Sequence, residues 1–281
     1  MKNFFLIAVL LIASVCYFGL HNSSDVSVNE PDKVLRVGVE CDYPPNNWEE
    51  DHSTNSNVPL VNKNGFFADG YDIQIAKIAA RSLGAKLEVK EIAWEDLIPA
   101  LNRNEIDAIF SGMLDTNERK KIISFTESYE ARVTEYAVVI QKSGKWTDAK
   151  KLTDFEGARF IAQVDSNLDL AIDQLTGAIH LPPVNATAEM LEALLNNKAD
   201  GIVTDFGIAE TYAKEHSNLK VVAFPKGESF VFDHTSVCAG VRKTDVELLK
   251  DLNKVFENLS AEERQKIMDG ALAKHMNDAN F

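Results

Sequence analysis

The sequence predicts an α/β protein built from two lobes. Its 281 residues are 45% hydrophobic, enough to bury a sizeable core in one large domain or in two lobes of ordinary size. Strand-like and helix-like segments alternate along the chain, in the rhythm of a doubly wound sheet. The same rhythm restarts after Ser143-Gly144-Lys145, so the chain reads as two α/β lobes of similar plan.

The first lobe begins with a strand at residues 34–39, which ends at the turn-rich segment 41–48. Residues 72–83 carry apolar side chains at helical spacing, and Gly84 ends that helix. Residues 49–64 are rich in Asn, Ser and charge, so we expect an exposed insertion there. The other expected elements are strands at 87–89 and 106–110 and helices at 95–102 and from Arg119 onward.

The second lobe opens with the strand-like run 135–140, which leads into Ser143-Gly144-Lys145. We then expect strands at 159–162 and 201–203 and helices at 167–175, 188–195 and 208–214. A late strand at 237–241 and helices at 246–259 and 261–272 close the chain. Periodicity alone does not assign these last elements to either lobe.

Charge and composition narrow the classes of function. The chain carries 43 acidic and 29 basic residues, a formal net charge of -14, and no concentrated basic surface of the kind that binds nucleic acid. Its His residues show no metal-ligand spacing, so we predict no metal site and no cofactor. Cys41 and Cys238 are too far apart for a zinc pair or a CxxC motif; buried free thiols and a disulfide both stay open.

The N-terminus reads as a targeting segment. An uncharged run at 4–20 follows Met1-Lys2-Asn3, and it is slightly short for a span of about 20 residues. Cys16 after Ile12-Ala13-Ser14-Val15 resembles a relaxed lipoprotein cleavage motif, in which that Cys becomes the lipidated first residue. We expect residues 1–22 to be a signal peptide or lipoprotein anchor and 23–32 a linker, which places the globular part outside the cytoplasm. An uncleaved anchor and an ordinary secreted product stay open.

One polar loop has the character of a carboxylate seat. It runs from Ser111 to Arg119, directly after the apolar strand 106–110. Small Ser111 and Gly112 let backbone N–H groups approach a ligand, and Thr116 can cap the following helix. Backbone donors, a helix start and the Arg119 guanidinium favour an anion at one point. The alternative is a plain strand-to-helix turn with a solvated Arg.

Several segments, taken in order, point to a known family. They are Leu35-Arg36-Val37-Gly38 with Tyr43-Pro44-Pro45, Gly70-Tyr71-Asp72, Trp94-Glu95-Asp96-Leu97, Ser111-Gly112-Met113 with Thr116-x-x-Arg119, and Ala199-Asp200-Gly201-Ile202-Val203-Thr204-Asp205. In this spacing, over residues 33–272, the chain resembles the extracytoplasmic amino-acid-binding proteins of bacterial ABC importers, family 3 of the solute-binding proteins. The resemblance implies a two-lobed periplasmic-binding-protein-like (type II) clamp with two hinge crossings, in which residues 33–134 and 231–281 form lobe 1 and residues 135–230 form lobe 2.

The resemblance also implies the ligand contacts. Arg119 would hold the ligand α-carboxylate, with help from N–H and hydroxyl groups around Ser111, Met113 and Asn167; Gly112 and Thr116 belong to the same loop. Asp205 would take the α-ammonium. Tyr43 and Trp94 would sandwich the ligand side chain, and Glu40 occupies the position that faces the cationic head in basic-amino-acid binders.

Departures from the family pattern gather near these positions. Leu114 stands where relatives usually have a hydroxyl or carboxylate, which puts one polar ligand contact in doubt. Asp165 replaces a common Gly, and Asn167 replaces a common Thr. The identity of the amino acid is therefore left open by the sequence.

The function implied is that of a substrate-binding protein of an ABC importer, which captures an L-amino acid between its lobes. Glu40 with the aromatic pair favours arginine, lysine or a similar cation, and glutamine stays open. Expected partners are the amino acid, a membrane permease and the membrane through the N-terminal anchor, with the protein as a monomer that binds no nucleic acid. A sensory subunit and a periplasmic dehydratase-like enzyme are the alternatives. We see no nucleophile-base pair or phosphate loop, so we predict no catalytic residue and no enzyme.

Overall fold

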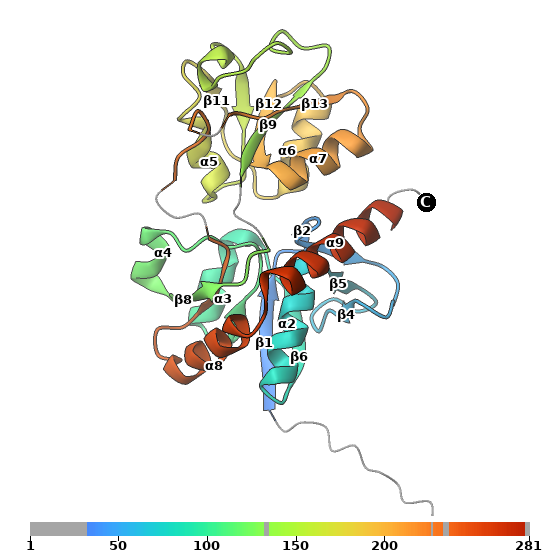
Figure 1. The fold of residues 1–281 in the computed structure, drawn as a ribbon, viewed down its shortest axis with the longest axis vertical. Coiled ribbons are helices and arrows are strands. Elements are labelled where there is room, and N and C mark those ends of the chain that lie inside the picture. Colours follow the sequence, from blue (N-terminus) through green and yellow to red (C-terminus); the bar gives the residue numbers. More distant parts are fainter. Residues whose placement is uncertain (1–32, 132–134, 226, 233–235, 279–281) are drawn as a thin grey trace, which may run out of the picture. The chain divides into compact units, whose positions relative to one another are not determined.

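The computed structural model describes residues 33–131, 135–225, 227–232 and 236–278. The expectations for the signal segment 1–22, the linker 23–32 and Cys16 fall outside these residues. Three sheets and the helices beside them make up the fold (Figure 1). In the described part of the chain, no helix combines the length and the apolar character needed to cross a membrane.

The first sheet has five strands in the order β6-β1-β7-β14-β8. Strand β1 pairs in parallel with β6 and with the central strand β7, and β14 runs antiparallel to β7 and β8. The late strand β14 therefore joins the N-terminal strands, a placement that periodicity did not supply. The bounds are β1 Lys33–Val39, β6 Ala85–Glu91, β7 Ala108–Ile109, β8 Ser124–Ser128 and β14 Cys238–Val241.

Helix α2 shows how the first sheet gains its core. The predicted helix 72–83 is observed at Tyr71–Ser82, and its Ile75, Ala76 and Ala79 are buried in one cluster with Leu35 of β1. Burial of this apolar stripe, rather than helix propensity, supplies most of such a helix's stability. The other helices of this part are η1 Trp94–Asp96, α3 Leu97–Asn102, α4 Asn117–Ile122, α8 Val246–Glu257 and α9 Ala261–Asp278.

The second sheet also has five strands, in the order β11-β10-β12-β9-β13. Strand β10 pairs in parallel with β11 and β12, and β9 runs antiparallel to β12 and β13. The bounds are β9 Tyr136–Gln141, β10 Arg159–Ile161, β11 Ile179–His180, β12 Gly201–Asp205 and β13 Leu219–Val222, with η2 Leu152–Phe155, α5 Asn167–Ile172, α6 Thr187–Leu195 and α7 Phe206–Glu215. The restart of the α/β rhythm is confirmed, with its own buried core.

A small third sheet corrects the expected insertion at 49–64. Its strands are β2 Asp42–Tyr43, β3 Asn47–Glu50, β4 Val58–Pro59 and β5 Phe67–Asp69, in the order β2-β3-β5-β4. Residues 51–57 lie at least partly exposed, but Glu50 and Leu60 are buried, so the expectation of an exposed insertion is wrong at these two positions.

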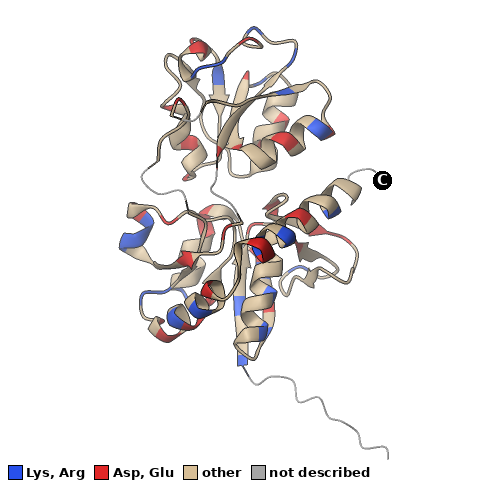
Figure 2. Ribbon diagram, in the orientation of Figure 1, with Lys and Arg blue, Asp and Glu red and all other residues tan. Residues whose placement is uncertain are grey.

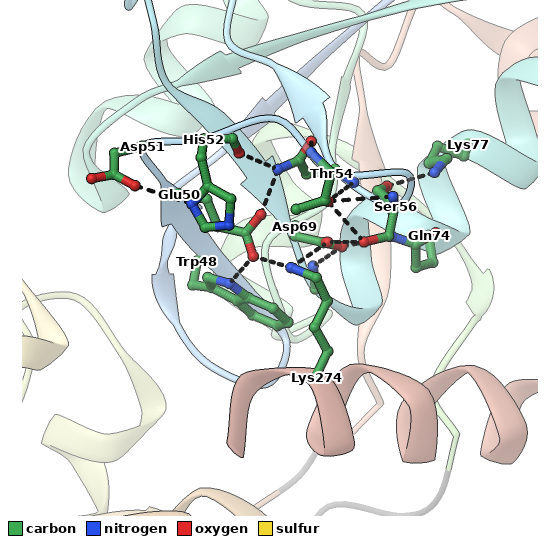
Figure 3. A network of polar contacts seen from close by, with 12 residues as sticks. Trp48, Glu50, Asp51, His52, Thr54, Ser56, Asp69, Gln74, Lys77 and Lys274 are labelled. Atoms are coloured by element: carbon green, nitrogen blue, oxygen red, sulfur yellow. Dashed lines mark hydrogen bonds and ion pairs between the residues drawn. The ribbon is translucent and has the colours of Figure 1, made fainter. Parts of the chain in front are cut away.

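Glu50 tolerates burial because α9 brings it a cation. The ammonium of Lys274 pairs with the carboxylate of Glu50 and lies 3.1 Å from Asp69 (Figure 3). The Trp48 indole N–H donates to Glu50 at 3.1 Å, and Ser56 donates to Asp69 at 2.5 Å. Paired and hydrogen-bonded in this way, two buried carboxylates join the small sheet to the C-terminal helix.

Cys41 and Cys238 are buried, free thiols. Burial raises the pKa of the Cys238 thiol to about 12 and also raises the pKa of Cys41. Of the two interpretations that the sequence left open, the structure confirms buried small side chains. At neutral pH both groups stay protonated and unreactive.

Acidic and basic residues are interspersed along the described helices and strands (Figure 2). The ion pairs follow the same mixture; Arg36 with Asp107 and Arg159 with Asp200 are examples, one from each large sheet. Both pairs are partly buried, and the mixture of signs leaves no large surface region of a single charge on the described part of the chain.

Candidate ligand site

The loop after β7 has the geometry that the sequence predicted. Ser111 is buried, and its hydroxyl accepts the backbone N–H of Glu40 at 3.0 Å. Gly112 has a φ of 61°, the left-handed region that favours glycine. A Cβ atom there would also meet the Tyr43 ring at 3.4 Å. The small residues thus let the loop approach the ends of β1 and β2.

Thr116 is the N-cap of α4, as predicted. Its hydroxyl accepts the backbone N–H of Arg119 at 3.3 Å, the hydrogen bond expected of a capping threonine. Arg119 is therefore held in the first turn of the helix. The side chain of Thr116 serves the helix and does not line the central cavity described below.

The Arg119 guanidinium is bound by carbonyl oxygens. It donates to the carbonyls of Leu114 at 3.0 Å and Asp165 at 2.8 Å, and its Cζ lies 5.0 Å from the Trp94 ring centroid. Burial lowers the pKa of Arg119 to about 10, so the group is still charged at pH 7. Within the described residues, no carboxylate forms an ion pair with this charge, which leaves Arg119 suited to an anionic ligand.

Tyr43 and Asp205 contact each other. The phenol donates a hydrogen bond to the Asp205 carboxylate, which ends β12. Burial and the neighbouring carboxylate raise the pKa of Tyr43 well above its ordinary value, so the phenol remains a donor. Asp205 occupies the N-cap position of α7 without a side-chain capping hydrogen bond. Its carboxylate faces the cavity.

Glu40 follows β1 and is 8% exposed. The Gln163 side-chain amide donates a hydrogen bond to its carboxylate. Burial, with a smaller contribution from nearby Asp42, raises the pKa of Glu40 to about 8. The ionised form is thus costly here unless a positive charge arrives.

These side chains surround one cavity of about 470 Å³. This volume counts space open to solvent as well as the enclosed part. Eight of the predicted site residues line it: Glu40, Tyr43, Trp94, Ser111, Gly112, Arg119, Asn167 and Asp205. Met113 does not; its side chain packs in the core beside Leu101 and Ile109. Thr116 lies outside as well, because it caps α4.

Sequence reasoning missed several lining residues, above all Tyr136, Gln163 and Ser166. Gln163 directly follows the predicted strand 159–162, and ligands of α/β folds bind at the carboxyl ends of parallel strands. That rule was the available signal. No sequence signal marks Tyr136 as a lining residue. It begins the antiparallel strand β9, and its hydrogen bond with Asn167 is a tertiary contact that the sequence does not show.

Two of the departures from the family pattern have structural counterparts. Asp165 has a φ of 55°, a conformation in which glycine is the usual residue. The Asp165 carbonyl accepts a hydrogen bond from Trp94 Nε1 at 3.4 Å and another from the Arg119 guanidinium. This loop therefore holds both the Trp94 ring and the Arg119 charge in place. Leu114 forms a backbone bridge with Val237, and the two residues supply apolar lining.

Comparison with known proteins agrees with this geometry. The arginine-binding extracellular protein of Bacillus subtilis is 25% identical over 255 residues, which cover 89% of this chain and 91% of that protein. An ancestral arginine-binding protein with arginine bound superposes with a TM-score of 0.70 at 28% identity and covers 86% of this chain and 99% of its own. An ancestral arginine-binding protein with glutamine bound also has a TM-score of 0.70 at 28% identity, and the match covers 84% of this chain and 96% of its own.

The sequence profile of the bacterial extracellular solute-binding proteins, family 3, matches residues 35–272, most of the chain. The two α/β sheets and the shared cavity are the fold of that family's two-lobed, type II clamp. The chain therefore belongs to the bacterial extracellular solute-binding proteins, family 3.

Proposed function

We propose that this protein captures a cationic L-amino acid, arginine first, and delivers it to the permease of an ABC importer. The charge count of the cavity carries the proposal. Its charged lining residues, among those described, are two carboxylates and one guanidinium: Glu40, Asp205 and Arg119. The α-carboxylate and α-ammonium of an amino acid match Arg119 and Asp205, which leaves one negative charge for a cationic side chain.

The backbone end of the ligand is recognised by Arg119 and Asp205. The planar guanidinium presents a fork of N–H donors that fits a carboxylate, and Arg119 has no carboxylate ion pair within the described residues. Asp205 would accept the α-ammonium, with the Tyr43 hydroxyl holding the carboxylate in place. Ser111 and Asn167 would add polar contacts beside these two charges.

The side-chain end of the ligand lies toward Glu40. The faces of Tyr43 and Trp94 suit an aliphatic stem or a guanidinium plane, and the Glu40 carboxylate would meet the cationic head. The arginine-binding relatives support this choice. Glutamine is the second candidate, because an ancestral arginine-binding protein is similar to this chain in its glutamine-bound structure.

Capture would proceed by closure of two lobes, residues 33–134 with 231–281 against residues 135–230. Strand membership of the two large sheets supports this division. Ligand bound to Arg119 in lobe 1 would favour the closed state through contacts made only there, of which Asp205 supplies one. The permease would then recognise the closed form.

We further propose that the protein is a monomer tethered outside the cytoplasm by a lipid on Cys16. The extracellular location of the family supports the compartment. The anchor is tested by labelling cells with a radioactive fatty acid: a lipoprotein takes up the label and Cys16→Ala abolishes the uptake, whereas an uncleaved anchor takes up no label in either form. Size-exclusion chromatography with light scattering tests the monomer.

A thermal-shift screen tests the ligand. A ligand at 100 times its Kd stabilises the folded state by about 2.7 kcal/mol. We expect arginine to give the largest upward shift in Tm among the common amino acids, followed by lysine. If no amino acid raises the Tm, the proposed function is contradicted. If glutamine raises the Tm more than arginine does, the ligand is a neutral amino acid instead of a cationic one.

A further inference from the structure

Gln163 contacts Glu40 across the cavity, although the two residues are 123 positions apart in the chain. Gln163 is 3% exposed. Its backbone forms a bridge with Val184, flanked by hydrogen bonds from Val164 N–H to Val184 O at 2.8 Å and from Val184 N–H to Ala162 O at 3.0 Å. A buried side chain on such a fixed backbone has little freedom, so its polar group is aimed at one place.

The neighbours of the Gln163 amide determine its orientation. The amide nitrogen donates both to the Glu40 carboxylate and to the Asn185 carbonyl, the latter at 3.0 Å. The reversed amide would place an oxygen against two acceptors, which excludes it. Gln163 therefore presents a fixed N–H to Glu40 and uses its second N–H to hold itself in place. It adds a donor but no positive charge.

The other groups that face Glu40 do not neutralise it either. Asp42 and Glu95 add negative potential and favour the protonated carboxyl. The Ser111 hydroxyl accepts the Glu40 backbone N–H and does not act on the carboxylate. Arg119 lines the same cavity but directs its side-chain hydrogen bonds to carbonyl oxygens. Among the residues that the structure describes, no cationic side chain forms an ion pair with Glu40.

We infer that Gln163 sets the charge selectivity of the ligand site. Its neutral amide holds the Glu40 carboxylate in position without cancelling its charge, so the ligand has to supply the cation. Gln163 acts through Glu40 and is a positioning residue. The inference rests on the proposed function and adds to it the residue that separates cationic from uncharged amino acids. A lysine at this position would supply the missing charge from the protein itself.

Arginine and citrulline are the decisive pair of ligands, because they share nearly the same shape and differ in charge. Isothermal titration calorimetry on the full-length protein at pH 8.5 gives the Kd of each. We expect wild type to prefer arginine. Gln163→Lys should raise the Kd of arginine roughly 100-fold or more, because it places like charges in a desolvated site. The Kd of citrulline should stay within about fivefold of the wild-type value. An unchanged preference for arginine in Gln163→Lys would overturn the inference.

Gln163→Met provides a second test that does not depend on a new buried charge. Methionine keeps the approximate size but donates no hydrogen bond, so ionised Glu40 loses support. The arginine Kd should then reach its plateau at a higher pH than in wild type, whereas the citrulline Kd should stay independent of pH. Loss of packing alone would weaken both ligands equally at every pH. An unmoved plateau, or equal losses for both ligands, would refute the positioning role.

Gln174→Met is the matched control. Gln174 follows α5, its amide donates to the Val231 carbonyl at 3.0 Å, and it does not line the cavity. This variant should keep the wild-type preference and pH profile. Wild type that binds no amino acid refutes the proposed function, and the inference with it. If both the wild type and Gln163→Lys prefer arginine, the inference is refuted and the proposed function stands. Wild type that prefers citrulline refutes the inference and the choice of a cation, but leaves an amino-acid clamp.

Discussion

Arginine affinity should depend steeply on pH, because the ligand's positive charge needs ionised Glu40. The pKa of Glu40 is raised from 4.5 to about 8, chiefly by burial. At pH 6 about 1% of the empty sites therefore carry the charge. If only the ionised site binds the guanidinium tightly, the Kd improves about tenfold per pH unit from pH 6 to pH 8 and levels off above. Each of these units corresponds to about 1.4 kcal/mol of binding free energy.

The assay is isothermal titration calorimetry between pH 6 and pH 9. At pH 6 arginine binding should release close to one proton, which appears as a dependence of the observed heat on the ionisation enthalpy of the buffer. Citrulline is the control ligand. Its side chain carries no charge, so its Kd should stay constant over this pH range. Glu40→Gln is the control variant, and it should abolish both the slope and the proton release.

Glu40 should also affect the stability of the ligand-free protein. As pH rises, the free energy of unfolding should fall, whereas the affinity for arginine should increase. Glu40 binds a proton in the folded state at pH values where the unfolded chain has released it, so the free energy of unfolding falls as pH rises from 4.5 to about 8. The full loss is on the order of 5 kcal/mol. Arginine should reverse much of it. A flat arginine profile between pH 6 and pH 8, without proton release, would refute the reasoning about Glu40.

Three further predictions concern other contacts. Arg119→Ala should remove the Tm shift with arginine, measured by thermal denaturation, because the α-carboxylate loses its guanidinium; a wild-type shift would exclude the carboxylate seat. Asp42→Ala should lower the free energy of unfolding in urea by about 1 kcal/mol, because the Asp42 carboxylate accepts the backbone N–H of Ala188 at the start of α6 at 3.0 Å and such caps contribute about that much; an unchanged free energy would contradict this. Lys274→Met should lower the free energy of unfolding in urea by about 3 kcal/mol, because Glu50 and Asp69 are left buried without their cation; a loss below about 1 kcal/mol would contradict it.

The sequence supported the local part of the site well. A buried strand, two small residues, a capping Thr116 and Arg119 in the following turn are all neighbours in the chain, so their geometry follows from local rules. The α/β class and the restart of its rhythm also follow from periodicity. The assignment of Tyr43, Trp94 and Asp205 to the same site came from the family resemblance, because no local rule joins three distant loops.

Contacts between distant segments set the limit of prediction. The role proposed for Gln163 depends on its contact with Glu40, 123 positions away. Glu50 can be buried because Lys274, 224 positions away in the chain, pairs with it. In each case the sequence around the residue looks like an ordinary polar loop. Only the tertiary structure shows that Glu50 is paired with a cation and that Glu40 is hydrogen-bonded to a neutral amide instead.

The two buried thiols make this protein a convenient scaffold for optical sensing. Maleimide dyes react with thiolates, and Cys41 and Cys238 remain protonated and enclosed at neutral pH. Cysteines introduced at exposed positions of the two sheets would therefore take up a donor and an acceptor dye without prior removal of these native residues. Energy transfer between the dyes would then report amino-acid concentration directly, as a colour ratio read in solution.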